Sequence, residues 1–118
     1  MVESFLQVEE RGPITIAQIQ EHKLYQNVVD PFQKSIINLV DNGKRQLVID
    51  MSKVEVINSS GLGVLILLCD RLNKEGGKMV VMGLCPLIDE LFERMRLYLL
   101  FKIVKTQEEA IAWMTSEE

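Results

Sequence analysis

Two neighbouring serines interrupt the most apolar part of the chain, in the segment VINSSGLGVLILL at positions 56–68. Ser59 and Ser60 follow Asn58 and precede Gly61, and a run of apolar residues comes soon after. A serine hydroxyl in such a turn can act as a nucleophile, cap the helix that follows or accept a phosphoryl group. The pattern predicts that the two hydroxyls lie at the N-terminus of a largely buried helix.

The rest of the sequence argues against an enzyme. The segment has neither the GxSxG pattern of a nucleophile elbow nor the lysine of a phosphate-binding P-loop. His22 is the only histidine, and nothing in the sequence places it beside the serines. Asp50 follows an apolar strand, as in a receiver domain, but the acidic pair and the lysine that accompany such an aspartate are not evident. We therefore expect no catalytic residue and no cofactor.

Metal binding and redox chemistry are also disfavoured. One histidine without a cluster of further ligands does not make a metal site. Cys69 and Cys85 form no CxxC pair and stand in apolar surroundings, which predicts two buried, reduced thiols. The sequence therefore predicts no metal site and no disulfide.

Two interpretations of the serines remain. In the first, Ser59 or Ser60 is the N-cap of the helix, and the glycines at 61 and 63 allow close packing. In the second, the same geometry serves a switch, because a helix N-terminus offers unpaired N–H groups and about half a positive charge. Phosphorylation would add roughly −1.5 to −2 charges there without unfolding the core.

Composition limits the possible classes of protein. Of the 118 residues, 47% are hydrophobic and 25% are charged, which predicts one globular domain over residues 1–118. The net charge of −4 and the absence of a basic run disfavour direct binding of nucleic acid. The longest apolar run, residues 64–69, is far shorter than the about 20 residues that span a membrane. The first residues lack the features of a secretory signal, so we expect a cytoplasmic protein without membrane attachment.

Strands and helices are expected to alternate. Residues 4–8 and Ile14–Ile19 read as a hairpin joined by a turn at residues 9–13. Further extended segments are expected at residues 46–50, 54–57, 78–82 and 101–104. The segments 46–50 and 78–82 carry consecutive apolar residues, which is typical of strands covered on both faces. The pattern predicts an α/β fold with a small, mostly parallel mixed sheet.

The first two helices have clear boundaries. The first is expected to begin with Asp30 as its N-cap and Pro31 at its first position, and to end at Asn42-Gly43. Residues 24–29 before it fit either a loop or an early helical turn. The second is expected over about residues 60–74 and is apolar nearly all round, so it is either deeply buried or contacts a partner.

Two more helices complete the prediction. The third opens at Pro86, and the fourth follows a capping box made by Thr106 and Glu109. The expected core faces of the four helices are Phe32, Ile36, Leu39 and Val40; Leu62, Leu65, Ile66, Cys69 and Leu72; Ile88, Leu91, Phe92 and Met95; and Ala110, Ile111 and Trp113 or Met114.

The segment LVIDMSKVEVINSSGLGVLI, residues 47–66, resembles the central signature of the STAS domain, in particular that of bacterial anti-sigma factor antagonists. That signature is an apolar strand ending near an aspartate, a turn, and the sequence D-S-S-G-L-G at the start of a helix. The segment GGKMVVMGLCPLIDELFERMRLYLLFKI, residues 76–103, continues the resemblance. The resemblance covers residues 14–115 and implies a single STAS domain with an N-terminal β-hairpin and about four helices.

The resemblance also implies a function. In that family the unmodified antagonist binds an anti-sigma factor that is also a serine kinase of the GHKL type, and this binding frees the sigma factor. The kinase phosphorylates the first serine of D-S-S-G, the antagonist dissociates, and a serine phosphatase resets it. Carried onto this chain, the phosphate acceptor is Ser59. The partner-binding residues implied are Asn58, Ser60, Gly61, Leu62 and Tyr25.

Two residues depart from the family pattern. Asn58 stands where the family has an aspartate, and keeps a short side chain that can hydrogen-bond within a turn. Tyr25 stands where an aspartate is expected in a loop that forms part of the family's partner surface. We expect a monomer or weak dimer. Two other functions stay open: a scaffold subunit that assembles with similar domains, and a transport-system subunit that docks on an ATPase or a permease without obligatory serine phosphorylation.

Overall fold

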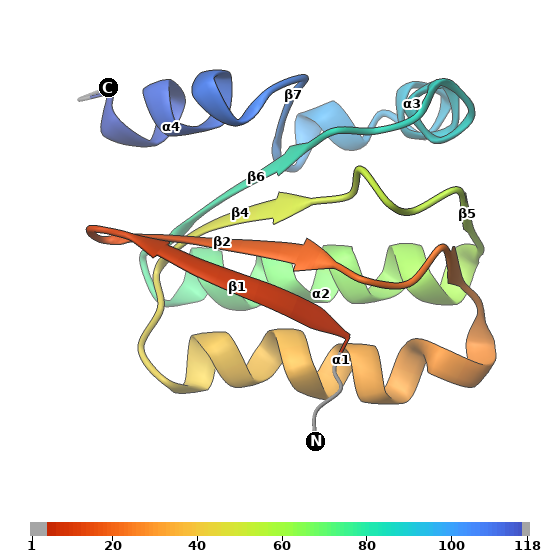
Figure 1. The fold of residues 1–118 in the computed structure, drawn as a ribbon, viewed down its shortest axis with the longest axis horizontal. Coiled ribbons are helices and arrows are strands. Elements are labelled where there is room, and N and C mark those ends of the chain that lie inside the picture. Colours follow the sequence, from red (N-terminus) through yellow and green to blue (C-terminus); the bar gives the residue numbers. More distant parts are fainter. Residues whose placement is uncertain (1–4, 117–118) are drawn as a thin grey trace.

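The computed structural model describes residues 5–116, and leaves aside the side chains of residues 26–29. Strands and helices alternate over most of that part of the chain (Figure 1). In chain order the elements are β1 Leu6–Arg11, β2 Ile14–Ile19, β3 Lys23–Leu24, α1 Gln26–Asp41, β4 Gln46–Asp50, β5 Val56–Ile57, α2 Ser59–Lys74, β6 Lys78–Met82, α3 Pro86–Arg94, the 3-10 helix η1 Leu97–Leu99, β7 Lys102–Val104 and α4 Gln107–Thr115. The predicted α/β fold with an N-terminal hairpin and four α-helices is confirmed.

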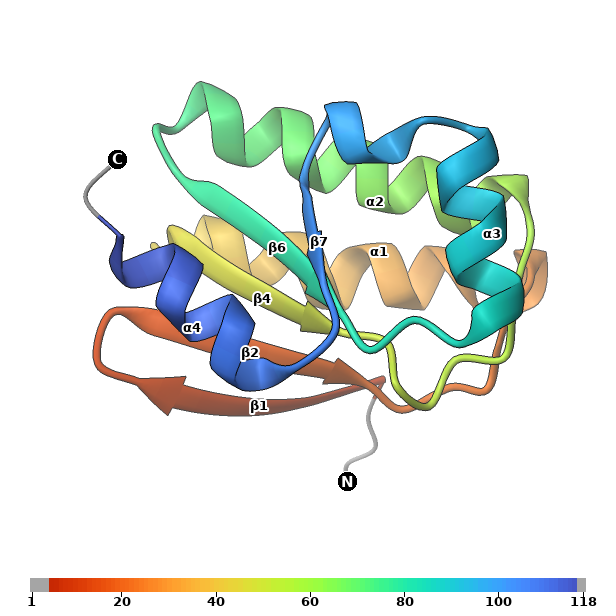
Figure 2. The same ribbon diagram turned by 90° about the horizontal axis from the view of Figure 1, so that it is seen from above.

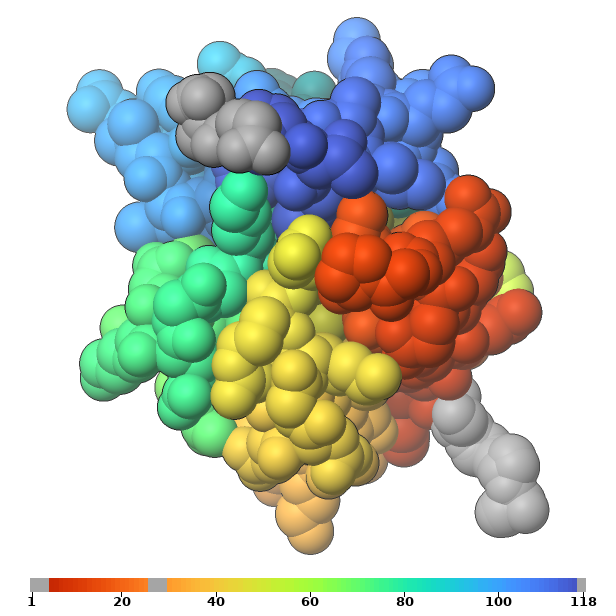
Figure 3. Space-filling model, turned by 90° about the vertical axis from the view of Figure 1, so that its left-hand side faces the viewer, coloured from red at the N-terminus to blue at the C-terminus, as the bar shows by residue number. Residues whose placement is uncertain are grey.

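The main sheet has five strands in the order β1-β2-β4-β6-β7. Only the β1–β2 pair is antiparallel, and each other pair of neighbours is parallel. Helices α1 and α2 cover one face, and α4 covers the other (Figures 1 and 2). The serine segment follows β5 at one end of the molecule, whereas Figure 3 shows the opposite end, where the hairpin and the connections into β4 and β6 meet.

Both faces of the central strands are buried, as the sequence predicts. In β4, Leu47 and Ile49 belong to the core beneath α1 and α2, and Val48 between them belongs to the core beneath α4. Strand β6 repeats this alternation, with Val81 in the first core and Val80 in the second. Because successive side chains of a strand point to opposite faces, only a sheet covered on both sides has room for such apolar runs.

The hairpin turn is shorter than expected. The predicted turn at residues 9–13 is wrong, because β1 continues through Arg11 and pairs it with Ile14. Gly12 has a φ of 61° and precedes Pro13, so these two residues reverse the chain alone, as in a type II′ turn. Ser4, the first residue of the predicted strand, lies outside the described residues.

Helix α1 begins earlier than predicted. Its N-cap is Tyr25 rather than Asp30, and Pro31 lies inside the helix. Proline lacks an N–H, so it removes only the hydrogen bond to the carbonyl of residue 27, and one further turn of helix forms before it. The predicted end is confirmed: Gly43 has a φ of 94°, and its N–H donates to the Val40 carbonyl at 3.0 Å.

Two residues of the predicted core faces, Ile66 and Met95, are exposed. Ile66 is 37% exposed on the outer side of α2, and Leu67 beside it is 38% exposed. Met95 is 47% exposed because α3 ends at Arg94, and the chain then turns into the unpredicted helix η1. The starts of the last two helices are as predicted, with Pro86 in the first turn of α3 and a capping box at the start of α4.

Candidate functional site

The side chain of Asn58 caps helix α2. Its Oδ1 accepts a hydrogen bond from the N–H of Gly61 at 3.1 Å, and its backbone is extended. The prediction that Ser59 or Ser60 is the N-cap is therefore wrong, and Ser59 is the first residue of the helix. Asparagine and aspartate carry the same Oδ1 acceptor, so Asn58 serves this position as well as the aspartate of the sequence pattern does.

Both serines lie in the first turn with unused hydroxyls. Ser59 is exposed and Ser60 is half-buried. Among residues 5–116, neither hydroxyl forms a hydrogen bond to a described side chain or backbone group, and the first turn of α2 holds no acidic residue. The helix N-terminus therefore presents an accessible hydroxyl in a region of positive potential with no carboxylate in the same turn to oppose an added negative charge.

Gly61 lets the start of α2 approach the backbone of β3. A Cβ placed on Gly61 would lie 2.8 Å from Cγ1 of Ile57 and 3.1 Å from the carbonyl oxygen of Leu24. The backbone N–H of Asn58 also reaches that oxygen, at 3.3 Å. The residues 58–61, named here the serine turn, are thus fixed against β3 from one side.

Strands β3 and β5 form a separate parallel pair that aligns the two helix starts. Leu24 pairs with Ile57, so the residues that follow them, Tyr25 and Asn58, leave the pair side by side. Tyr25 is 40% exposed and is the N-cap residue of α1. The sequence gives little signal for this pair, because two-residue strands are too short to show an alternating pattern.

The predicted partner-binding residues do not all reach the surface. Tyr25 is exposed, and Asn58 and Ser60, the neighbours of Ser59 in the chain, are half-buried. Gly61 is buried, and Leu62 is only 4% exposed because it belongs to the core beneath α1 and α2. Gly61 and Leu62 therefore lie beneath the exposed residues, and their contact with a partner stays a prediction.

The Asp50 carboxylate and the His22 ring, two other polar groups that the sequence singles out, have structural partners. The Asp50 carboxylate accepts hydrogen bonds from Gln18 Nε2 at 3.1 Å and from the Ser52 N–H at 2.9 Å. His22 Nδ1 lies 3.0 Å from the Lys53 carbonyl oxygen. Within the described part of the chain, no group of His, Cys, Asp and Glu side chains could hold a metal ion.

The two cysteines are free thiols in different settings. Cys69 is buried, and burial raises the pKa of its thiol above the ordinary value, which lowers its reactivity. Cys85 is only half-buried, at the residue before α3, so the prediction of two buried thiols is correct for Cys69 alone.

Replacing the cap tests the geometry of the turn. Asn58→Ala removes the acceptor for the Gly61 N–H and is expected to lower the free energy of unfolding by about 1 kcal/mol. Asn58→Asp keeps the acceptor and adds negative charge at a helix N-terminus, so it should melt at or slightly above the wild-type temperature. Thermal unfolding of the three proteins measures this, and an unchanged melt for Asn58→Ala would show that the cap contributes nothing.

Comparison with known proteins gives a consistent assignment. The family model described as the STAS domain matches residues 5–110. BtrV of Bordetella bronchiseptica, named as a candidate anti-sigma factor antagonist, is 33% identical over 73 residues, which cover 62% of this chain and 63% of BtrV. The match therefore spans less than two thirds of that relative.

Solved structures share the fold at low sequence identity. A candidate anti-sigma factor antagonist from Thermotoga maritima superimposes with a TM-score of 0.86 at 19% identity, over 94% of this chain and 95% of that chain. The Bacillus protein SpoIIAA in its phosphorylated form gives 0.69 at 18% identity, over 92% and 97%. A sulfate transporter family protein from Wolinella succinogenes gives 0.74 at 17% identity, over 88% and 86%. In the described part of this chain, no helix is long and apolar enough to cross a membrane.

Proposed function

This chain belongs to the STAS domain family, and we propose on that basis that it is an anti-sigma factor antagonist that works by partner switching. In its unmodified form it binds an anti-sigma factor that is also a serine kinase of the GHKL type. Phosphorylation of Ser59 by that kinase releases it, and a serine phosphatase restores the binding form. The chain acts in the cytoplasm as a binding protein and carries no catalytic residue of its own.

The observation that carries this proposal is the position of Ser59. It is the first residue of α2, it is exposed, and its hydroxyl makes no hydrogen bond to any described residue. Ser60, one residue later, is half-buried and therefore less accessible to a kinase. The relatives named as antagonists, and the SpoIIAA structure in a phosphorylated form, support an antagonist that is switched by phosphorylation.

Transfer of the phosphoryl group to Ser59 requires few groups of this protein. The Ser59 oxygen attacks the γ-phosphorus of ATP held by the kinase, the bond to the bridging oxygen breaks, ADP leaves, and the hydroxyl proton passes to a base of the kinase. The antagonist supplies only an exposed hydroxyl on a rigid support. The cap by Asn58 and the packing of Gly61 against β3 provide that rigidity.

Release follows from the charge that the phosphate brings. Roughly −1.5 to −2 charges appear at the centre of a surface that loses its water when the kinase binds. Burying that charge without a new partner is unfavourable, so the complex weakens. Within the antagonist the phosphate is tolerated, because negative charge near a helix N-terminus is favourable by about 0.3–1 kcal/mol.

The choice of acceptor can be tested directly. Incubation of the cognate kinase and ATP with Ser60→Ala should give phosphate incorporation close to that of the wild type, whereas Ser59→Ala should incorporate none. Tandem mass spectrometry of the wild-type product should place the phosphate on Ser59. Incorporation into Ser59→Ala at the wild-type level would assign the reaction to another residue.

A transport-system subunit is the second candidate, favoured by the similarity to the Wolinella sulfate transporter family protein. In that role the chain docks on a permease or an ATPase, and Ser59 need not be modified. A scaffold subunit that assembles with similar domains is the third. If the wild type and Ser59→Asp bind a permease, an ATPase or a similar domain with the same affinity, that result would favour these functions over the switch.

A further inference from the structure

Exposed apolar side chains are concentrated at the 3-10 helix η1. Tyr98, Leu99 and Leu100 are 51%, 70% and 49% exposed, whereas Leu97 before them is buried. Isolated exposed apolar residues are common on protein surfaces, but neighbouring ones often mark a site of contact with another molecule. The cluster includes no residue of the serine turn, so it indicates a second contact surface.

The exposed cluster borders a hollow with a volume of 340 Å³, named here the η1 hollow. Cys69 and Asn73 of α2 line it from one element, and Trp113 of α4 lines it from another. The Cys69 thiol donates to the Leu100 carbonyl oxygen at 3.2 Å, which holds the end of η1 next to α2 (Figure 2). The volume lies at the lower end of the roughly 300–1,000 Å³ that ligand sites occupy, so the hollow has room for a large side chain from another molecule.

The charged residues that line the η1 hollow are both cations. Lys78 is half-buried, with its Nζ 5.4 Å from the centre of the Trp113 ring, and Lys102 is exposed. Neither lysine forms an ion pair with any described residue. No carboxylate of the described residues lines the hollow, although the chain has 17 acidic and 13 basic residues. The hollow is thus positively charged on an acidic protein.

The carboxylates at the end of α2 do not neutralise these lysines. Asp70 pairs with Lys74 at 3.2 Å, and Glu75 pairs with Arg45 at 3.3 Å. The exposed carboxylates of α3 line two other hollows and not this one. The two lysines are therefore available to carboxylates of another molecule.

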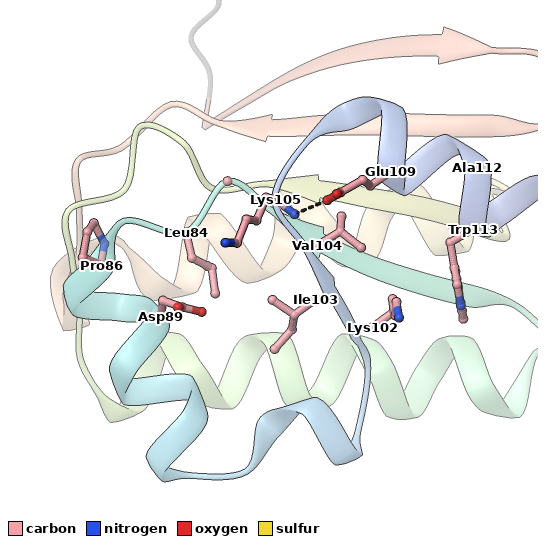
Figure 4. Close-up of a pocket in the computed structure, with 11 residues that line it drawn as sticks. Leu84, Pro86, Asp89, Lys102, Ile103, Val104, Lys105, Glu109, Ala112 and Trp113 are labelled. Atoms are coloured by element: carbon pink, nitrogen blue, oxygen red, sulfur yellow. Dashed lines mark hydrogen bonds between the residues drawn. The ribbon is translucent and has the colours of Figure 1, made fainter.

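The adjoining groove, drawn in Figure 4, differs in its charge. It shares Lys102 and Trp113 with the η1 hollow, but Asp89 and Glu109 also line it. Two lysines and two carboxylates leave that groove without a net charge that would indicate an occupant. Cations without carboxylates are a feature of the η1 hollow and not of this groove.

The charge of the η1 hollow also bears on what can cover it. In a symmetric dimer the same face meets itself, so Lys78 and Lys102 would face the lysines of a second copy, and like charges oppose association. The net charge of −4 likewise opposes binding to an anionic membrane surface. A protein segment with carboxylates beside a large apolar side chain complements both the lysines and the exposed apolar cluster.

We propose that the η1 hollow docks an acidic segment of a partner protein, with a large apolar side chain of that segment seated against Leu99 and Trp113. Carboxylates of the same segment pair with Lys78 and Lys102. Asn73 at the hollow lies about 21 Å from Ser59 along α2, at about 1.5 Å per residue. This site is separate from the phosphorylation switch and does not depend on it.

The probe for a test is a peptide selected from a phage-displayed library of random short peptides on the immobilised wild-type protein. Selected sequences should share a large apolar residue with Asp or Glu beside it. Trp113 is the only tryptophan of the chain and lines the hollow. Titration with a synthetic selected peptide should therefore change the tryptophan fluorescence of the protein in a saturable way.

Two variants with matched controls test the contact. Leu99→Ala and Lys102→Glu should each weaken the selected peptide about tenfold or more, since the first removes the apolar contact and the second opposes the carboxylates. Leu87→Ala and Lys34→Glu should bind as the wild type does, because Leu87 is a leucine of α3 that is 65% exposed, Lys34 is an exposed lysine of α1, and neither lines the hollow. Ser59→Asp should also bind normally, which keeps this test independent of the proposed switch.

Four outcomes would overturn the proposal. The first is that no peptide is enriched, or that the enriched peptides lack acidic residues. The second is equal binding of the selected peptide to the wild type, Leu99→Ala and Lys102→Glu. The third is self-association of the wild type that Leu99→Ala abolishes, which would make a second copy the occupant. The fourth is peptide binding that appears only after residues 117–118 are removed, which would make the end of this chain the occupant.

Discussion

Ser59→Asp is expected to bind the cognate kinase at least about a hundredfold more weakly than the wild type. The substitution places a carboxylate at the first residue of α2, on the surface that loses water in the complex. A like-charge or unpaired-charge contact costs several kcal/mol, and each 1.4 kcal/mol corresponds to about a tenfold change in affinity. Calorimetric titration of the kinase with each variant measures the change.

Stability provides the control for this loss of affinity. Ser59→Asp should melt at about the wild-type temperature or slightly above it, because a carboxylate near a helix N-terminus is favourable by roughly 0.3–1 kcal/mol. Ser59→Ala should bind as well as the wild type. It should also keep the stability of the wild type, because the cap of the helix is Asn58 and not Ser59. Equal affinities for the three proteins would reject the switch, and a large fall in the melting temperature of Ser59→Asp would indicate a structural role.

Gly61→Ala should destabilise the fold by about 1–3 kcal/mol, the usual cost of forcing extra volume into a packed region. The added methyl group would meet Ile57 Cγ1 at 2.8 Å and the Leu24 carbonyl oxygen at 3.1 Å, and the second of these is backbone. Relief requires α2 to move away from β3, which would also displace Ser59. Chemical denaturation measures the loss of stability, and the rate of phosphorylation at Ser59 should fall with it.

Gly63→Ala is the matched control on the same helix. A Cβ at Gly63 meets no atom within 4 Å. Alanine is the better helix former, so this variant should gain about 0.5–1 kcal/mol of stability. A loss of stability in Gly63→Ala equal to that in Gly61→Ala would show that the close approach at Gly61 is not the cause.

The sequence predicts most of the fold because its strongest signals are local or periodic. The consecutive apolar residues of β4 and β6 and the capping box of Thr106 and Glu109 were sufficient to place those elements. The start of α1 was not predictable in the same way. Asp30 and Pro31 form a good start signal, yet the helix begins at Gln26 because the chain leaves the β3–β5 pair directly into a helix.

The sequence predicts which segment contains the candidate site, but it does not predict which residue of that segment caps the helix or which side chains are exposed. The sequence places Asn58 next to two serines, and all three residues are good N-caps, so only the structure distinguishes the cap from the residues that follow it. Likewise, the apolar pattern of α2 does not separate Leu62, which is buried, from Ile66, which is exposed. That difference depends on where α1 and β6 pack against α2, and those contacts join residues distant in the sequence.

The most direct test of the proposed switch is tandem mass spectrometry of the protein isolated from its own cells. The proposed switch predicts a mixture of unmodified protein and protein with one phosphate on Ser59, and the phosphorylated fraction should not co-purify with the kinase. Phosphate on Ser60 instead, or a serine turn without phosphate in cells that contain the active cognate kinase, would contradict it.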